Sequence, residues 1–96
     1  ALRDQINRSC GSVMDNIAEG FERSSKLEFI NFLSYSKGSV GEVKSQLYRA
    51  MDRNYLSADK FQQFYDRADE ITKMSTSLIT YLNQATIKGK KFKDRL

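Results

Sequence analysis

Apolar residues recur mostly at spacings of three and four in three long segments of a chain without proline. The third segment is the most regular and carries Phe61, Phe64, Ala68, Ile71, Ser75, Leu78, Leu82 and Ala85. Residues three and four apart lie on the same face of an α-helix, and this heptad pattern is typical of helices that pack together. The sequence therefore predicts an all-α fold made of long amphipathic helices.

The three expected helices cover about residues 2–23, 25–53 and 58–86. The second begins at Ser25, because Ser25 and Glu28 have the spacing of a capping box that satisfies two backbone donors. Asn54 suits the left-handed residue that closes this helix, and Ser57 or Asp59 can cap the third. Short turns make consecutive helices antiparallel neighbours, so we expect an antiparallel up-and-down four-helix bundle of which three helices are evident here.

The positive charge of the chain is concentrated at its C-terminal end. The formal net charge is +4, and residues 88–96, KGKKFKDRL, hold five basic residues and one acidic residue. The remaining residues hold eleven of each sign and are neutral overall. This distribution predicts a neutral helical bundle over residues 1–87 and a basic C-terminal tail over residues 88–96.

Few residues in this chain could perform catalysis. Histidine is absent, and Cys10 is the single cysteine. Because Cys10 falls on the apolar stripe of the first helix, we expect it to be buried and structural rather than nucleophilic. No apolar run approaches the roughly 20 residues of a membrane span. We therefore expect a cytoplasmic protein that is not an enzyme and has no catalytic, metal or cofactor site.

The second helix carries a line of small residues, which are Ser34, Gly38, Gly41 and Ser45. It lies roughly 150° around the helix from the apolar line of the same helix. That apolar line consists of Phe29, Leu33, Val40, Val43, Leu47 and Met51. Each glycine inside a helix costs about 1 kcal/mol relative to alanine. The line therefore predicts the close approach of a second backbone, from a neighbouring helix or from another subunit; a merely weak helix is the alternative.

Three motifs of the sequence resemble those of a known family. They are Asn16-Ile17-Ala18-Glu19-Gly20 followed by Arg23, Ser25-Lys26-x-Glu28-Phe29, and Lys37-Gly38-Ser39-x-x-Glu42. They occur in the order of the four-helix-bundle family of 23S rRNA intervening-sequence proteins, to which the accessory variability determinant proteins of diversity-generating retroelements are related. The resemblance implies a bacterial, non-catalytic bundle, often a ring-shaped homopentamer. For the retroelement members it also implies association with nucleic acid and with a reverse transcriptase.

The family normally has one more helix, before the first one counted here. Without it, the apolar seam between the first and third helices would be uncovered, which a monomer tolerates poorly. We therefore expect either that this helix lies outside the present sequence or that another chain covers the seam.

The matching motifs contain four polar residues beside the apolar stripes, which are Asn16, Glu19, Ser39 and Glu42. We expect Asn16 and Glu19 to bond across to the second helix near Ser39 and Glu42, because satisfied buried polar groups often fix the register of a pair. A ligand site formed by the same residues is the alternative.

Two groups of basic residues are candidates for nucleic-acid contact. They are Lys26, Lys37 and Lys44, within about 20° of one line on the second helix, and Lys88, Lys90, Lys91, Lys93 and Arg95 of the tail. Both could contact phosphates, although lysine stems often only cover the edge of a core. The sequence thus favours an oligomeric accessory protein that binds RNA or DNA without sequence preference and a protein partner such as a reverse transcriptase. A purely structural or protein-interaction bundle is the alternative.

Overall fold

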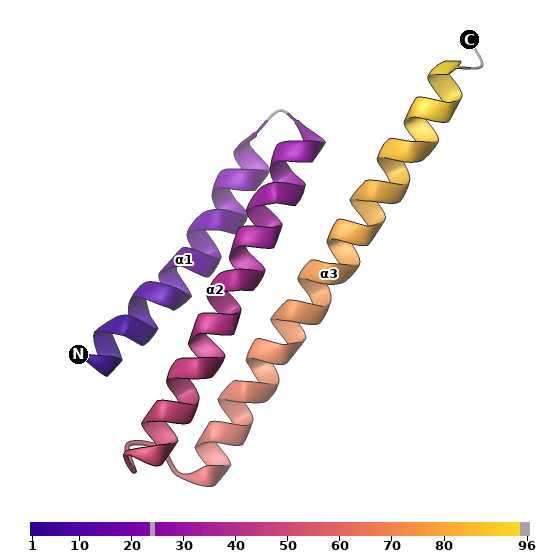
Figure 1. Ribbon diagram of the computed structural model, residues 1–96. Coiled ribbons are helices and arrows are strands. Elements are labelled where there is room, and N and C mark those ends of the chain that lie inside the picture. The colour runs from indigo at the N-terminus through magenta and orange to yellow at the C-terminus, as the bar shows by residue number, and fades with distance from the viewer. Residues whose placement is uncertain (24, 95–96) are drawn as a thin grey trace.

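The computed structural model describes the backbone of residues 1–23 and 25–94, and the side chains among these as far as residue 84. The described chain consists of three helices, α1 (Leu2–Glu22), α2 (Lys26–Asp52) and α3 (Ala58–Asp94), and contains no strand (Figure 1). The all-α class predicted from the spacing of the apolar residues is confirmed. The starts of all three helices agree with the sequence prediction to within one residue.

Serine side chains fix where α2 and α3 begin. Ser25 Oγ accepts a hydrogen bond from the backbone nitrogen of Glu28 at 3.3 Å, and Ser57 Oγ accepts one from Lys60 at 3.1 Å. These bonds satisfy backbone donors that the first turn of a helix leaves unpaired. The Glu28 carboxylate lies 3.8 Å from the side-chain Nε of Arg23. Asn54, with φ of 61°, takes the left-handed conformation that was predicted after α2.

The third helix is longer than predicted. Its regular apolar pattern ends near residue 86, yet the helix continues to Asp94. The extra residues include no proline, and one glycine costs a helix only about 1 kcal/mol. Residues 88–94 of the basic tail are therefore helical in their backbone, whereas Arg95 lies outside the described residues.

The three helices form one flat layer rather than a closed bundle. α2 lies between α1 and α3 and packs against both, but α1 and α3 do not pack against each other in the described chain (Figure 1). The Cα trace measures 62 × 21 × 13 Å, which reflects this single layer. A small core joins the helices through Val13 of α1, Val40 of α2 and Ala68 of α3. One long side of the layer is consequently left open.

Candidate functional site

An apolar groove runs along the open side of the layer, between α1 and α3, with α2 as its floor. It encloses about 940 Å³ and is lined by all three helices. Its apolar lining includes Ile6, Cys10, Val43, Leu47, Phe64 and Ile71. The seam that was predicted to be uncovered is therefore open in this chain.

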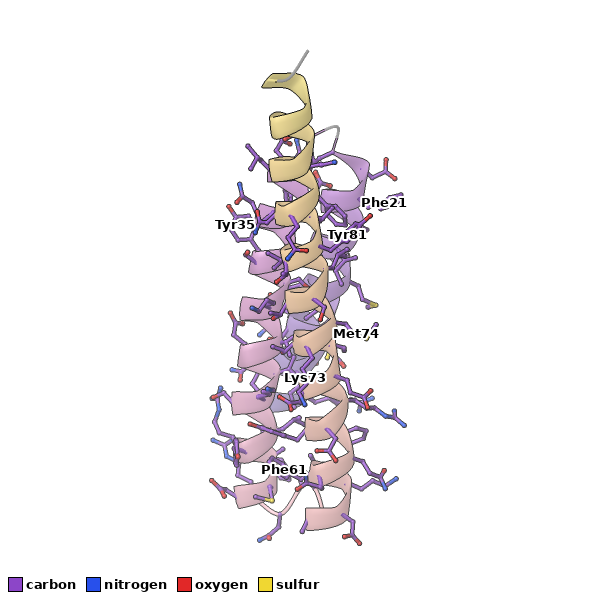
Figure 2. All side chains as sticks on the ribbon, turned by 90° about the vertical axis from the view of Figure 1, so that its right-hand side faces the viewer. Phe21, Tyr35, Phe61, Lys73, Met74 and Tyr81 are labelled. Carbon is purple, nitrogen blue, oxygen red and sulfur yellow. The ribbon has the colours of Figure 1, made fainter. Side chains whose placement is uncertain are left out.

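Large apolar side chains are also exposed on α1 and α3 towards the other end of the layer. Phe21 is 77% exposed, Met74 71% and Tyr81 65%. Figure 2 shows Phe21 of α1 and Met74 of α3 on the same side of the molecule, opposite Tyr35 of α2. Phe21 belongs to the apolar stripe of α1, and Met74 and Tyr81 flank that of α3. They are exposed because no described part of the chain lies between α1 and α3.

The prediction that Cys10 is buried is wrong for this chain, since Cys10 is exposed. Its position on the apolar stripe was read correctly, because it lines the apolar groove beside Ile6 and Val13. A stripe residue is buried only where a second element covers it. Cys10 is exposed because the groove above it is open.

Serine hydroxyls connect α1 to α2 in a row. Ser36 Oγ, which is fully buried, donates to the carbonyl oxygen of Val13 at 3.0 Å. Ser12 Oγ and Ser39 Oγ are 2.9 Å apart, and Ser9 Oγ donates to Glu42 Oε2 at 3.4 Å. Ser39 and Glu42 thus lie at the α1–α2 interface, where the sequence analysis expected them.

Their partners differ from the predicted ones. Asn16 Nδ2 donates to the carbonyl oxygen and to Oγ of Ser12, at 2.8 and 3.1 Å, so it reaches α2 only through that serine. Glu19 pairs instead with Arg23, the residue that directly follows α1, at 2.7 Å. Sequence reasoning missed Ser9 and Ser12. Their signal was the 3–4 spacing of Ser9, Ser12 and Asn16 beside the apolar stripe.

The line of small residues on α2 faces open space within this chain. Ser34, Gly38, Gly41 and Ser45 are all exposed, and a Cβ added at either glycine would meet nothing within 4 Å. The expected approach of a neighbouring helix therefore does not occur at this line, and approach by another subunit stays a prediction.

The close helix contact is at Gly20 instead. A Cβ at Gly20 would lie 2.7 Å from Phe32 Cβ and 2.9 Å from Phe29 Cδ1. Such distances are shorter than real Cβ atoms show, so only glycine lets α1 approach α2 here.

The three lysines predicted to form one line have different environments. Lys44 Nζ lies 2.8 Å from Asp69 Oδ1 of α3 and 5.0 Å from the centre of the Tyr65 ring. Lys26 is exposed and Lys37 is half-buried, and neither has an acidic partner among the described residues. Lys44 is therefore engaged in joining α2 to α3, whereas Lys26 and Lys37 remain available for other contacts.

The pKa values around Lys44 reflect this ion pair. The hydrogen bond that Lys44 donates to Asp69 raises the pKa of Lys44 above its usual value, and the same bond lowers the pKa of the Asp69 carboxyl. Tyr48 lies beside Tyr65, with ring centres 5.6 Å apart, and the charge that Tyr65 would carry raises the pKa of Tyr48. The charged forms of Lys44 and Asp69 are therefore both favoured at neutral pH.

The remaining candidate lysines, Lys88, Lys90, Lys91 and Lys93, lie on the last turns of α3. Their backbone is helical, but their side chains are outside the described part of the chain. In the described helices, none is long and apolar enough to cross a membrane.

A second, polar cleft lies between α1 and α2. It encloses about 340 Å³ and is lined by Gln5, Arg8, Ser9, Ser12, Glu42 and Gln46. Gln46 is only 7% exposed, and its Oε1 is buried without a hydrogen-bond partner among the described residues. Sequence reasoning found Glu42 of this cleft but neither Arg8 nor Gln46.

Comparison with known proteins gives one family and a matching structure. The family model described as 23S rRNA-intervening sequence protein matches residues 1–77. A solved structure of a protein of unknown function, from the S23 ribosomal protein family of Bacteroides thetaiotaomicron VPI-5482, is 26% identical with a TM-score of 0.79. The similarity covers 82% of this chain and 73% of that chain. No curated protein matches this chain.

Proposed function

Since the chain belongs to the family of 23S rRNA-intervening sequence proteins, we propose that it is a non-enzymatic helical accessory protein that works as an oligomer and binds RNA or DNA without sequence preference. A protein partner, such as a reverse transcriptase, binds the assembled protein.

The open apolar groove is the observation that supports the helical assembly in this proposal. Exposed apolar surface of this extent marks a place where another element packs. A helix is the occupant that suits a groove between two helices, because it would restore the missing contact between α1 and α3. We propose that this helix comes from the same polypeptide or from a second copy, and that it completes a four-helix bundle.

The line of small residues on α2 supports contact between completed bundles. Gly38 and Gly41 are exposed and have open space around them. They lie outside the lining of the apolar groove, so a helix that fills the groove leaves them accessible. Packing of another copy along this line would explain two glycines inside a long helix. Repetition of one such contact gives a closed ring, and a pentamer is the ring that the family resemblance implies.

Lys26, Lys37 and the lysines at the end of α3 support nucleic-acid binding. Lysine side chains can neutralise phosphates, and Lys26 and Lys37 have no acidic partner among the described residues. This type of contact carries no sequence information. A ring would present the same weakly basic surface several times, which raises overall affinity through avidity. Lys44 is not part of this surface, since its charge is matched by Asp69.

Sedimentation velocity and fluorescence anisotropy test the two parts of the proposal separately. We expect an oligomer at tens of micromolar, and its loss in Gly38→Leu, which places a bulky side chain on the small-residue line. Gly11→Leu is the matched control, because Gly11 of α1 also has open space around its Cβ position. A monomeric parent, or association unchanged by Gly38→Leu, contradicts the proposed assembly.

For binding, we expect the oligomer to bind unrelated single-stranded RNA and DNA oligonucleotides with similar affinity at about 50 mM salt, and more weakly as salt increases. A parent oligomer that binds neither at that salt favours the rival function, a structural or protein-interaction bundle. A structural or protein-interaction bundle accounts for the groove and the small-residue line equally well. The binding measurement therefore decides between that function and nucleic-acid binding.

A further inference from the structure

Two large apolar side chains of α3, Met74 and Tyr81, stay exposed even in the proposed four-helix bundle. Met74 is 71% exposed and Tyr81 65%. Neither residue lines the apolar groove, so a helix that fills the groove reaches only their edge. Figure 2, which views the molecule from the side of α3, shows both residues on that helix. Exposed methionine and tyrosine on one side of a helix are typical of a surface that packs against another chain.

Met74 and Tyr81 point away from α2. Tyr65 marks the side of α3 that faces α2, because the ring centres of Tyr65 and Tyr48 are 5.6 Å apart. At about 100° per residue, Met74 lies roughly 180° and Tyr81 roughly 160° around α3 from Tyr65. Together they form an apolar ridge along the outer edge of the layer, which we call the α3 ridge.

The α3 ridge lies at the same height along the molecule as the small-residue line of α2. Lys44 and Asp69 are in direct contact, and this contact fixes the antiparallel register of α2 and α3. Met74 follows Asp69 by five residues. In an antiparallel pair it is therefore level with residue 39 of α2, between Gly38 and Gly41.

The two surfaces are also complementary in shape. The α3 ridge consists of two large side chains seven residues apart, and the same spacing separates Ser34 from Gly41 on α2. The glycines have open space around their Cβ positions, which a flexible methionine side chain can fill. By the same register Tyr81 is level with residue 32, so its hydroxyl group would meet the polar Ser34. Tyrosine is common in interfaces because its ring packs while its hydroxyl bonds.

We infer that the α3 ridge of one copy packs on the small-residue line of a second copy. The inference rests on the proposed assembly and identifies the opposite surface of its contact. In a ring whose axis runs along the helices, rotation shifts nothing along that axis, so surfaces at the same height meet. Each copy therefore uses two different surfaces, and the contact is not symmetric.

The directions of the two surfaces agree with a closed ring. The small-residue line lies roughly 90° around α2 from Lys44, which faces α3. It therefore points out of the layer, whereas the α3 ridge points along the layer and away from α2. Contact surfaces that face roughly 90 to 110° apart close into a ring of about four or five copies.

Cross-linking of single-cysteine variants of the full chain tests this contact. In a Cys10→Ser background, Gly38→Cys and Met74→Cys place one thiol on each surface. The two variants are refolded together and treated with a short bifunctional thiol reagent. We expect covalent dimers in the mixture and at least about tenfold fewer in either variant alone, because a cross-link requires two neighbouring thiols.

Gln63→Cys, refolded with Gly38→Cys, is the matched control. Gln63 is exposed on the same side of α3 as Tyr81, eighteen residues earlier, but it is level with residue 50 of α2. It should therefore cross-link to Gly38→Cys at least about tenfold less than Met74→Cys does. A chain that carries both Gly38→Cys and Met74→Cys should give a ladder of covalent products, whose largest member counts the copies in the ring.

The outcomes separate this contact from the assembly on which it rests. A parent that sediments as a monomer contradicts the assembly and the contact with it. An oligomeric parent in which Gly38→Cys cross-links to itself, or equally to Gln63→Cys and Met74→Cys, overturns the contact alone. Sedimentation of the reduced variants shows whether they still assemble. Where Gly38→Cys prevents assembly, the pair Ser34→Cys and Tyr81→Cys decides in the same way.

Discussion

Lys44 Nζ lies 2.8 Å from Asp69 Oδ1 and so joins the middle of α2 to α3. The lysine side chain is 21% exposed and also lies over the Tyr65 ring, 5.0 Å from its centre. Lys44 therefore stabilises the packing of α2 against α3 and is no longer a candidate for phosphate contact.

The Lys44–Asp69 pair should stabilise the protein only over a defined pH range. The pKa of Asp69 is lowered in the folded protein, so the stability that its charge contributes is lost as pH falls through that folded pKa. The pKa of Lys44 is raised, so the stability that its charge contributes is lost as pH rises through the folded pKa of Lys44. The pair thus acts fully between about pH 4 and about pH 10. We expect Lys44→Met to lower the melting temperature at pH 7 and to match the parent once Asp69 is protonated.

The matched control is Lys73→Met, because Lys73 Nζ is 3.6 Å from the same carboxylate and its side chain is 78% exposed. Its effect at pH 7 should be smaller. An equal loss of stability in Lys44→Met at low and neutral pH would show that packing of the lysine stem, not the charge, is what matters.

Gly20 should tolerate no side chain. A Cβ there would lie 2.7 Å from Phe32 Cβ, an atom fixed to the backbone of α2 that cannot move away alone. We expect Gly20→Ala to destabilise the protein by about 1 to 3 kcal/mol, the usual cost of overpacking. Chemical denaturation of Gly20→Ala beside Gly11→Ala checks this, since alanine at Gly11 meets nothing within 4 Å. Equal stability of the two variants would contradict the close α1–α2 contact.

The serines that bond α1 to α2, Ser36 and Ser39, should contribute more to stability than the charged Glu19 of the family motifs. Ser36 is fully buried and donates to Val13, and Ser39 bonds Ser12 across the interface. We expect Ser36→Ala and Ser39→Ala to cost about 0.5 to 1.5 kcal/mol each. Glu19→Ala should stay within about 0.5 kcal/mol, because its ion pair with Arg23 is on the surface. Urea denaturation measures the free energy of unfolding of the three variants. A larger loss of stability in Glu19→Ala than in the two serine variants would contradict this prediction.

Cys10 offers a direct test of whether the groove is filled in solution. Its thiol is exposed in this chain and lines the groove. If a helix fills the groove, a colorimetric thiol reagent should modify Cys10 at least about tenfold more slowly than in the urea-unfolded protein, because reactivity requires access. A Cys10→Ser, Ser77→Cys variant is the control, since Ser77 is exposed on α3. Equal rates at the two positions would show that the groove is open.

The sequence predicts those features of the fold that depend on neighbours along the chain. The spacing of apolar residues and the caps at Ser25 and Ser57 are local, so the helices and their starts agree with the structure. The end of α3 was placed too early because the apolar pattern stops before the helix does. Without a proline or a second packing surface, no local signal marks that end.

Features that depend on the packing of one helix against another could not be predicted from local sequence patterns. The sequence places Lys44 on the second helix, but its role depends on Asp69, a residue 25 positions later on α3. Cys10 was placed on the correct face, and its exposure depends on whether another element covers the groove. The unpaired oxygen of Gln46 has no signal in the sequence, because it results from the packing of α1 against α2.

The last prediction concerns which lysines contact nucleic acid. Because Lys44 is paired with Asp69, we expect Lys26→Glu, Lys37→Glu to weaken binding and to reduce the salt dependence of affinity while helicity is retained. Deletion of residues 88–96 should reduce the salt dependence further, since the slope of log affinity against log salt is roughly 0.7 to 0.9 per phosphate neutralised. Lys60→Glu, Lys73→Glu is the matched control, with two exposed lysines of α3 reversed. Anisotropy titrations over a range of salt concentrations measure all four proteins. An equal change in slope for the control pair would mean that net charge, not a basic surface on α2, governs binding.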